Sequence, residues 1–95
     1  MNRSDLLAGV FQIALGVTAG QARILAHLYV RQDPLHWELL RMRVGCAGKD
    51  TLEAQASKAR KIIGGGILCR DQMYRLTDNA RARLAAILDE ARGLL

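Results

Sequence analysis

Apolar residues recur with a helical period over most of the chain. Their spacing predicts five helices, over residues 4–15, 18–31, 35–44, 50–63 and 78–92. In the fourth stretch, Leu52, Ala56 and Ala59 fall three or four positions apart and share one helix face with Ile63. The opposite face of that stretch is polar, and we expect it to remain in solvent.

Residues typical of helix ends stand between these stretches. The expected N-terminal caps are Ser4, Thr18 with Gln21 as a capping box, Asp50 or Thr51, and Thr77. Gly16 and Gly45 are expected to end the first and third helices, and Pro34 keeps the second from continuing. Three consecutive glycines, 64–66, are expected to end the fourth.

Two short apolar segments, 67–70 and 73–76, follow the glycines and are separated by Asp71 and Gln72. This pattern predicts a β-hairpin. The predicted helices 35–44 and 50–63 are short, are joined by a glycine-bearing turn, and the second of the two is basic. These features are typical of a helix-turn-helix. A hairpin directly after the second helix makes the motif winged.

The predicted fold is therefore mainly α with a small β-hairpin. The length of 95 residues fits one domain, 1–95. We expect a winged helix-turn-helix with a three-helix core over 18–63, a wing over 67–76, and additional N- and C-terminal helices over 4–15 and 78–92.

The net charge is +5, and its location is more informative than its size. Residues 41–75 carry eight basic and three acidic side chains, whereas the rest of the chain carries six of each. A local basic excess is typical of a surface for a polyanion. Nucleic acid is the first candidate and an anionic membrane the second.

A family resemblance rests on four segments between residues 17 and 76. They are Val17-Thr18-x-x-Gln21-Ala22-x-Ile24-Leu25-x-x-Leu28, Leu40-x-x-x-Val44, Thr51-Leu52-Glu53-Ala54-Gln55-Ala56-Ser57-Lys58-Ala59-Arg60-Lys61, and Tyr74-Arg75-Leu76-Thr77. These segments resemble the winged-helix effector domain of OmpR/PhoB-type response regulators. The third segment is similar to the recognition helix of that family, and the fourth to its final wing strand.

The resemblance implies a small bacterial or phage transcription regulator that binds specific double-stranded DNA, with 50–63 as its recognition helix. The chain departs from the family in three places. A helix replaces the family's N-terminal sheet, Ala56 and Ala59 stand where bulkier residues are usual, and Asp71-Gln72 replaces an Arg-Gly pair in the wing. The segment 76–81 and the helix after it look more like the end of a MarR-type regulator.

The outer face of the fourth helix provides the main candidate site. Its expected DNA-contacting residues are Thr51, Glu53, Ala54, Gln55, Ser57, Lys58, Arg60 and Lys61. Gln55 and Ser57 carry short polar groups that can read base edges, whereas basic side chains can hold phosphates or read guanine. The alternative is an ordinary solvated helix face.

Four further basic residues lie in neighbouring segments. Arg41, Arg43 and Lys49 flank the turn between the third and fourth helices, either as phosphate contacts or as ordinary surface charges. Arg70 at the hairpin can reach a minor groove or a phosphate, although Asp71 beside it repels phosphate. The alternative for the hairpin is a purely structural role.

The sequence does not favour an enzyme, a metal site or a cofactor. His27, His36, Asp33 and Glu38 do not form a recognisable catalytic set, and no Cys-x-x-Cys pair exists. Cys46 and Cys69 are expected to be reduced, as in a cytoplasmic protein. The apolar runs are too short for a membrane span.

Three questions about partners remain open at this stage. The apolar terminal helices either form a homodimer interface or pack on each other within the monomer. Trp37 either belongs to the core or anchors a partner protein. The rival to DNA binding is a winged-helix protein-interaction module, an adaptor or anti-repressor, while RNA or membrane binding ranks third.

Overall fold

A computed structural model describes residues 2–93. The elements in chain order are α1 (Arg3–Leu15), α2 (Ala19–Tyr29), β1 (Leu35–His36), α3 (Trp37–Val44), α4 (Lys49–Ile62), β2 (Ile67–Arg70), β3 (Met73–Leu76) and α5 (Asp78–Gly93). The described chain is mainly helical with a small antiparallel sheet, which confirms the predicted secondary-structure class. None of its helices is both long and apolar enough to cross a lipid bilayer.

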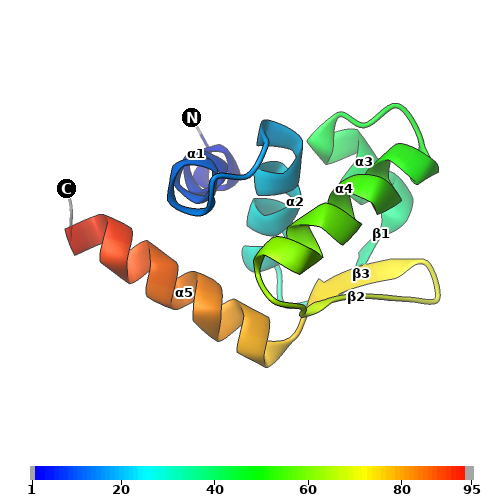
Figure 1. Cartoon of the computed structure of the whole chain (residues 1–95). Helices are drawn as coiled ribbons and strands as arrows, with labels where there is room; N and C mark the ends of the chain where they lie inside the picture. The colour runs from blue at the N-terminus through cyan, green and yellow to red at the C-terminus, as the bar shows by residue number, and fades with distance from the viewer. Residues whose placement is uncertain (1, 94–95) are drawn as a thin grey trace.

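Helix α2 lies at the centre of the molecule and contacts α1, α3 and α4 (Figure 1). Its inward residues Ile24 and Leu25 are completely buried, as are Leu40 of α3 and Leu52 of α4. Helix α5 leaves the hairpin and runs toward α1, where the two helices make contact. The core therefore joins every helix, and α4 keeps one face outside it.

The sheet has three strands rather than the two of the predicted hairpin. Its order is β1-β3-β2, with Leu35 opposite Tyr74 and Cys69 opposite Tyr74 on the other side. The prediction that residues 35 and 36 begin the third helix was wrong. Leu35 is instead extended and buried, opposite Tyr74 in the sheet, and the ring Nδ1 of His36 accepts the Glu38 N–H as the cap of α3.

The prediction that Ser4 caps α1 was wrong. The side-chain oxygen of Asn2 accepts the Asp5 N–H at 2.9 Å and also the Ser4 hydroxyl, so the helix begins one residue earlier. Helix α4 begins after Gly48 without a side-chain cap, so neither Asp50 nor Thr51 has that role. The absence of a cap leaves the first amides of α4 available to other acceptors.

Other predicted helix ends are confirmed. Thr18 and Gln21 form the capping box of α2, and the Thr77 hydroxyl accepts the Ala80 N–H at the start of α5. Gly16 and Gly45 end α1 and α3 in the left-handed conformation. Helix α2 ends at Tyr29, two residues before the predicted end.

The end of α2 is held by a side chain from α5. Arg81 donates hydrogen bonds to the backbone carbonyls of Leu28, Tyr29 and Arg31, and its guanidinium lies over the Tyr29 ring at 5.6 Å. Carbonyls at a helix C-terminus lack partners within the helix, so a cation that binds two of them, and the Arg31 carbonyl just beyond the helix, stabilises that end. This contact joins residues about 50 positions apart in sequence.

We expect Arg81→Met to lower the free energy of unfolding by about 2 kcal/mol, because charged hydrogen bonds to partly buried carbonyls are lost. Urea unfolding followed by circular dichroism measures the change. Arg83→Met is the matched control, since exposed Arg83 donates to one carbonyl only, that of Gly65. Equal losses in the two variants would contradict the proposed role of Arg81.

The titration of His27 on α2 is expected to make the stability of the fold depend on pH. Its pKa is lowered from 6.5, first by burial and then by Arg43 and Arg23, while Asp5 opposes the shift. The folded state therefore favours the neutral ring, and the unfolded state takes up a proton more readily. Stability should be complete above pH 6.5 and fall as the pH decreases below that value. His27→Gln should flatten this dependence between pH 7 and pH 5 relative to the wild type; an unchanged slope would contradict it.

Candidate nucleic-acid interface

The exposed ridge of α4 is the best-formed candidate surface. Buried Leu52, Ala56 and Ala59 hold the other side of the helix in the core. With 3.6 residues per turn, the side chains farthest from this buried stripe are those of Asp50, Ala54, Ser57, Lys58 and Lys61. Two cations thus lie on a ridge whose other members are mostly small, so the helix backbone can approach a ligand closely.

Arg60 lies on the flank of α4 that faces the hairpin. Its Nε donates to the Ile67 carbonyl at 2.7 Å and joins α4 to β2. Glu53 lies on the same flank, and both residues act on Tyr74. The pKa of Tyr74 is raised to about 12, first by burial and then by Cys69 and Glu53, while Arg60 opposes the shift. Arg60 therefore has a structural contact that Lys58 and Lys61 lack.

Gln55 lies on the opposite flank of α4, beside the start of α2. A Cβ placed on Gly20 would be 3.9 Å from Cδ of Gln55, so the side chain packs closely against α2. Its Oε1 is buried and has no hydrogen-bond partner among the described residues. The structure thus places Gln55 away from the central ridge on which the sequence analysis grouped it.

The basic residues around the α3–α4 turn have different surroundings. Arg41 donates to the Cys46 carbonyl at 3.2 Å and orders the turn. The Lys49 ammonium lies 5.4 Å from the centre of the Trp37 ring, which is partly buried against the core. Arg43 is exposed and is close enough to His27 to lower the pKa of that ring. Only Arg43 lacks such a contact with the turn or with Trp37.

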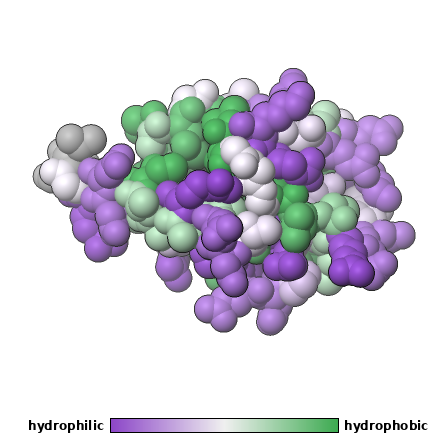
Figure 2. Space-filling view, turned by 60° about the horizontal axis from the view of Figure 1, so that its bottom comes forward, coloured by the Kyte–Doolittle hydropathy of each residue, from purple (hydrophilic) through white to green (hydrophobic). Residues whose placement is uncertain are grey.

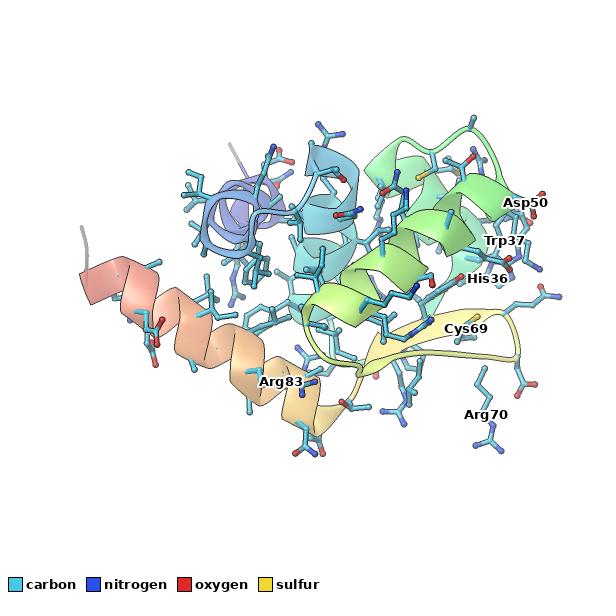
Figure 3. The ribbon with its side chains drawn as sticks, viewed as in Figure 1. His36, Trp37, Asp50, Cys69, Arg70 and Arg83 are labelled. Carbon is cyan, nitrogen blue, oxygen red and sulfur yellow. The ribbon has the colours of Figure 1, made fainter. Side chains whose placement is uncertain are left out.

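The hairpin separates Arg70 from the α4 ridge. Side chains alternate between the two faces of a strand, and directly opposed residues share a face. Buried Tyr74 and its partner Cys69 face α4, so the Arg70–Met73 pair points the other way. Figure 3 shows Arg70 directed away from α4, on the far side of the ribbon from Cys69.

Arg83 is a basic residue near the end of α4 that the sequence analysis missed. It belongs to α5, and its Nη2 donates to the Gly65 carbonyl at 2.8 Å, in the turn that ends α4 (Figure 3). No local pattern in the sequence indicates this contact, because Arg83 and Gly65 are 18 positions apart. Its proximity to α4 depends on the direction in which α5 leaves the hairpin.

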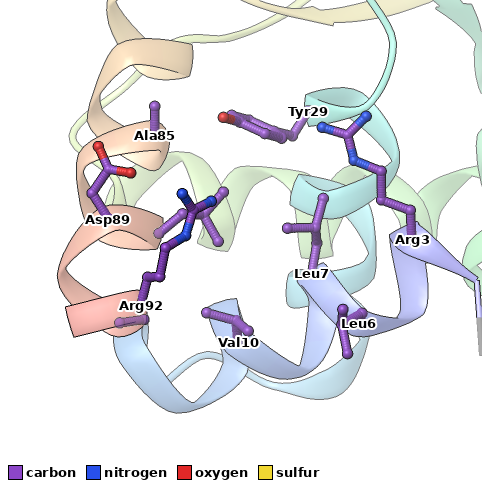
Figure 4. Close-up of a pocket in the computed structure, with 10 residues that line it drawn as sticks. Arg3, Leu6, Leu7, Val10, Tyr29, Ala85, Asp89 and Arg92 are labelled. Atoms are coloured by element: carbon purple, nitrogen blue, oxygen red, sulfur yellow. The ribbon is translucent and has the colours of Figure 1, made fainter. Parts of the chain in front are cut away.

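A second surface feature lies between the terminal helices. A groove of about 360 Å³ separates α1 from α5, with apolar walls that include Leu6, Leu7 and Val10 (Figure 4). Arg3 and Arg92 extend into it, and Asp89 stands beside Arg92. Leu6 is 60% exposed, and Ile13 on the same helix is 87% exposed. The terminal helices contact each other, yet α1 keeps an uncovered apolar edge.

Comparisons of the chain with protein-family models, with curated proteins and with solved structures find no significant match. Among residues 2–93, no three histidine, cysteine or acidic side chains gather where they could hold a metal ion. The geometry of the α4 ridge and of the elements around it is therefore the feature that bears on function.

Proposed function

We propose that the chain is a winged-helix protein that binds double-stranded DNA, with α4 as the recognition helix in the major groove. The observation that carries this proposal is the α4 ridge, where Lys58 and Lys61 stand beside Ala54 and Ser57. This ridge has Lys61 and Ala54 at its centre, Lys58 and Ser57 at its sides and Asp50 near its N-terminal end, and its small residues allow it to enter a groove about 12 Å wide. The lysines then contact phosphates, and the Ser57 hydroxyl faces base edges.

The surrounding elements support this proposal. Helix α2, strand β1, helices α3 and α4 and the β2–β3 hairpin follow one another in the order of a winged helix. Helix α3 precedes α4 through a short turn that Arg41 holds in place, as in a helix-turn-helix. In this arrangement Arg83 lies near the C-terminal end of α4 and extends its positive surface toward the phosphates.

The role follows from binding rather than catalysis. A protein that occupies a DNA site regulates transcription by blocking or recruiting other proteins, and we propose such a regulator in the cytoplasm. The thiols of Cys46 and Cys69 are free, as reducing conditions require. No cofactor is needed for this activity.

NMR spectra recorded while a duplex of about 25 base pairs is added test the placement of the interface. The amides of α4 from Asp50 to Lys61 should shift most. Shifts concentrated on α1 and α5, or none at all, would contradict the assignment. In that case the rival function, a protein-interaction module, would gain support from Leu39 and Met42, which are 47% and 65% exposed on α3.

We further propose that two copies pair through the α1–α5 groove. The groove carries both Arg92 and Asp89, so a two-fold axis can place the acid of one copy against the base of the other. The exposed Leu6 side chain would then be covered by its partner. A two-fold arrangement would present two α4 helices to successive turns of the major groove.

We expect Leu6→Glu to convert the dimer into a monomer, because the partner copy would then cover a charged side chain in place of an apolar one. Sedimentation equilibrium across a range of concentrations measures this change. Met42→Glu is the matched control, since Met42 is similarly exposed but lies on α3. A wild-type chain that sediments as a monomer at every concentration would contradict the dimer while leaving the DNA proposal intact.

A further inference from the structure

The face of the hairpin that points away from α4 has a regular arrangement of side chains. Leu68 stands opposite Arg75, and Arg70 stands opposite Met73. The two arginines therefore occupy one diagonal of this face and the two apolar residues the other. Such diagonal neighbours lie about 7–8 Å apart. With Pro34 and Asp71, these four residues line a hollow of about 290 Å³.

This outer hairpin face, defined by Leu68, Arg70, Met73 and Arg75, has no role in the proposed contact between α4 and DNA. Neither guanidinium forms an ion pair with a described residue, and Leu68 is 40% exposed. Figure 2, which brings this side of the molecule forward, shows hydrophobic surface over the hairpin bordered by hydrophilic side chains. Exposed apolar surface framed by cations is typical of a binding site.

The neighbouring backbone points to an extended ligand. Strand β2 is an edge strand, because the sheet order is β1-β3-β2 and β2 pairs only with β3. Its residues Leu68, Cys69 and Arg70 are all exposed. An edge strand can pair with an extended peptide, and side chains of that peptide can then lie over the adjacent face.

We propose that the outer hairpin face binds an extended, acidic segment of a partner protein, with carboxylates on Arg70 and Arg75 and an apolar side chain between Leu68 and Met73. An arginine fork binds a carboxylate through two parallel hydrogen bonds, which suits both unpaired guanidinium groups. A second copy of this chain is a poor occupant, because its hairpin brings the same positive charges. This inference does not depend on DNA binding by α4.

Duplex DNA is the competing occupant, since its phosphates also attract arginine. Two features favour the peptide. Burial of Leu68 and Met73 is favourable only against an apolar group of the ligand, and Asp71 in the lining repels any anion, so the ligand must place its charges away from the turn. A carboxylate pair spaced along a strand can avoid Asp71 at the turn, whereas a continuous phosphate backbone passes it.

The test selects displayed random peptides of 12 residues on the intact chain and compares their binding to two double variants. The peptides recovered should carry two or more carboxylates alternating with apolar residues. Their affinity should fall roughly tenfold or more with Arg70→Glu/Arg75→Glu. The matched control, Lys58→Glu/Lys61→Glu on α4, should retain it, which separates this inference from the DNA proposal.

Leu68→Ser provides a second variant that keeps the charge, and it should also weaken peptide binding. Circular dichroism establishes that each variant is folded. The proposal is overturned if selection yields no acidic peptide, or if the selected peptides bind Arg70→Glu/Arg75→Glu as well as the wild type. It is also overturned if that double variant loses duplex DNA binding while no peptide depends on it, since the face then belongs to DNA.

Discussion

Replacement of both Lys58 and Lys61 by glutamate is expected to weaken duplex binding by roughly 100-fold at about 50 mM salt. Each lysine lies on the exposed ridge of α4, where it can reach a phosphate without breaking a contact within the chain. The variant removes two cations from the interface and adds two anions that repel the backbone. Fluorescence anisotropy with a labelled duplex measures the change.

In the part of the chain that the structure describes, Lys58 and Lys61 have no hydrogen bond to the hairpin, unlike Arg60. Charge reversal at Arg60 would also break its hydrogen bond to the Ile67 carbonyl, so weaker binding could reflect a displaced hairpin. The control is Arg70→Glu/Arg75→Glu, which makes the same change in net charge on the outer hairpin face. Its DNA affinity should stay within about threefold of wild type, allowing for long-range electrostatics only. Equal losses in the two double variants would contradict a localised α4 interface.

Gly66→Ala is expected to lower the free energy of unfolding by about 3 kcal/mol, through backbone strain and overpacking. Gly66 has a φ of 101°, a conformation that residues with a side chain rarely adopt. An added Cβ would also collide with the Ala80 side chain and lie 2.9 Å from the Thr77 hydroxyl oxygen. The Gly66 carbonyl accepts the Thr77 N–H, so relief of the collision would move the start of α5.

Gly65→Ala separates the effect of backbone strain from the effect of overpacking on the free energy of unfolding. Gly65 has a similar φ of 98°, but an added Cβ would meet no other atom within 4 Å. We expect Gly65→Ala to lower the free energy of unfolding by only about 1 kcal/mol, which is the cost of the left-handed backbone conformation. Urea unfolding of both variants gives the comparison. If Gly66→Ala were no worse than Gly65→Ala, α5 would not pack against the glycine turn as described.

Local sequence signals predicted much of the fold because they act within a few residues. The Thr18–Gln21 capping box, the glycines after α1, α3 and α4, and the two-residue hairpin turn all depend on short-range hydrogen bonds or backbone conformation. The helical spacing of Leu52, Ala56 and Ala59 correctly identified the buried side of α4. Each signal involves residues no more than one or two turns apart.

The errors arose where distant residues decide the structure. Leu35 and His36 are extended because they pair with β3, almost 40 positions later, and no local pattern shows this pairing. Asn2 displaced Ser4 as a cap, although both residue types suit that position equally well. At such sites the local sequence favours two conformations almost equally. Tertiary contacts, or the residue at which the helix begins, then determine which conformation forms.

The candidate site was predictable as a helix but not residue by residue. Spacing placed Gln55, Arg60 and Lys61 on one polar side of α4. The structure separates them, because α2 covers one flank and the hairpin covers the other. The position of Arg70 was available from the sequence, since strand alternation sets it opposite the face of apolar Tyr74 and Leu76.

The salt dependence of duplex binding tests the central claim most directly. Anisotropy titrations of the wild-type chain and of Lys58→Glu/Lys61→Glu, between about 50 and 200 mM salt, give the slope of log affinity against log salt concentration. The wild type should bind with a steep negative slope. The double variant should bind more weakly, with a slope shallower by about 1.8, since each phosphate contact contributes about 0.9. Failure of the wild type to bind at the lowest salt, or equal slopes for the two proteins, would contradict DNA binding through α4.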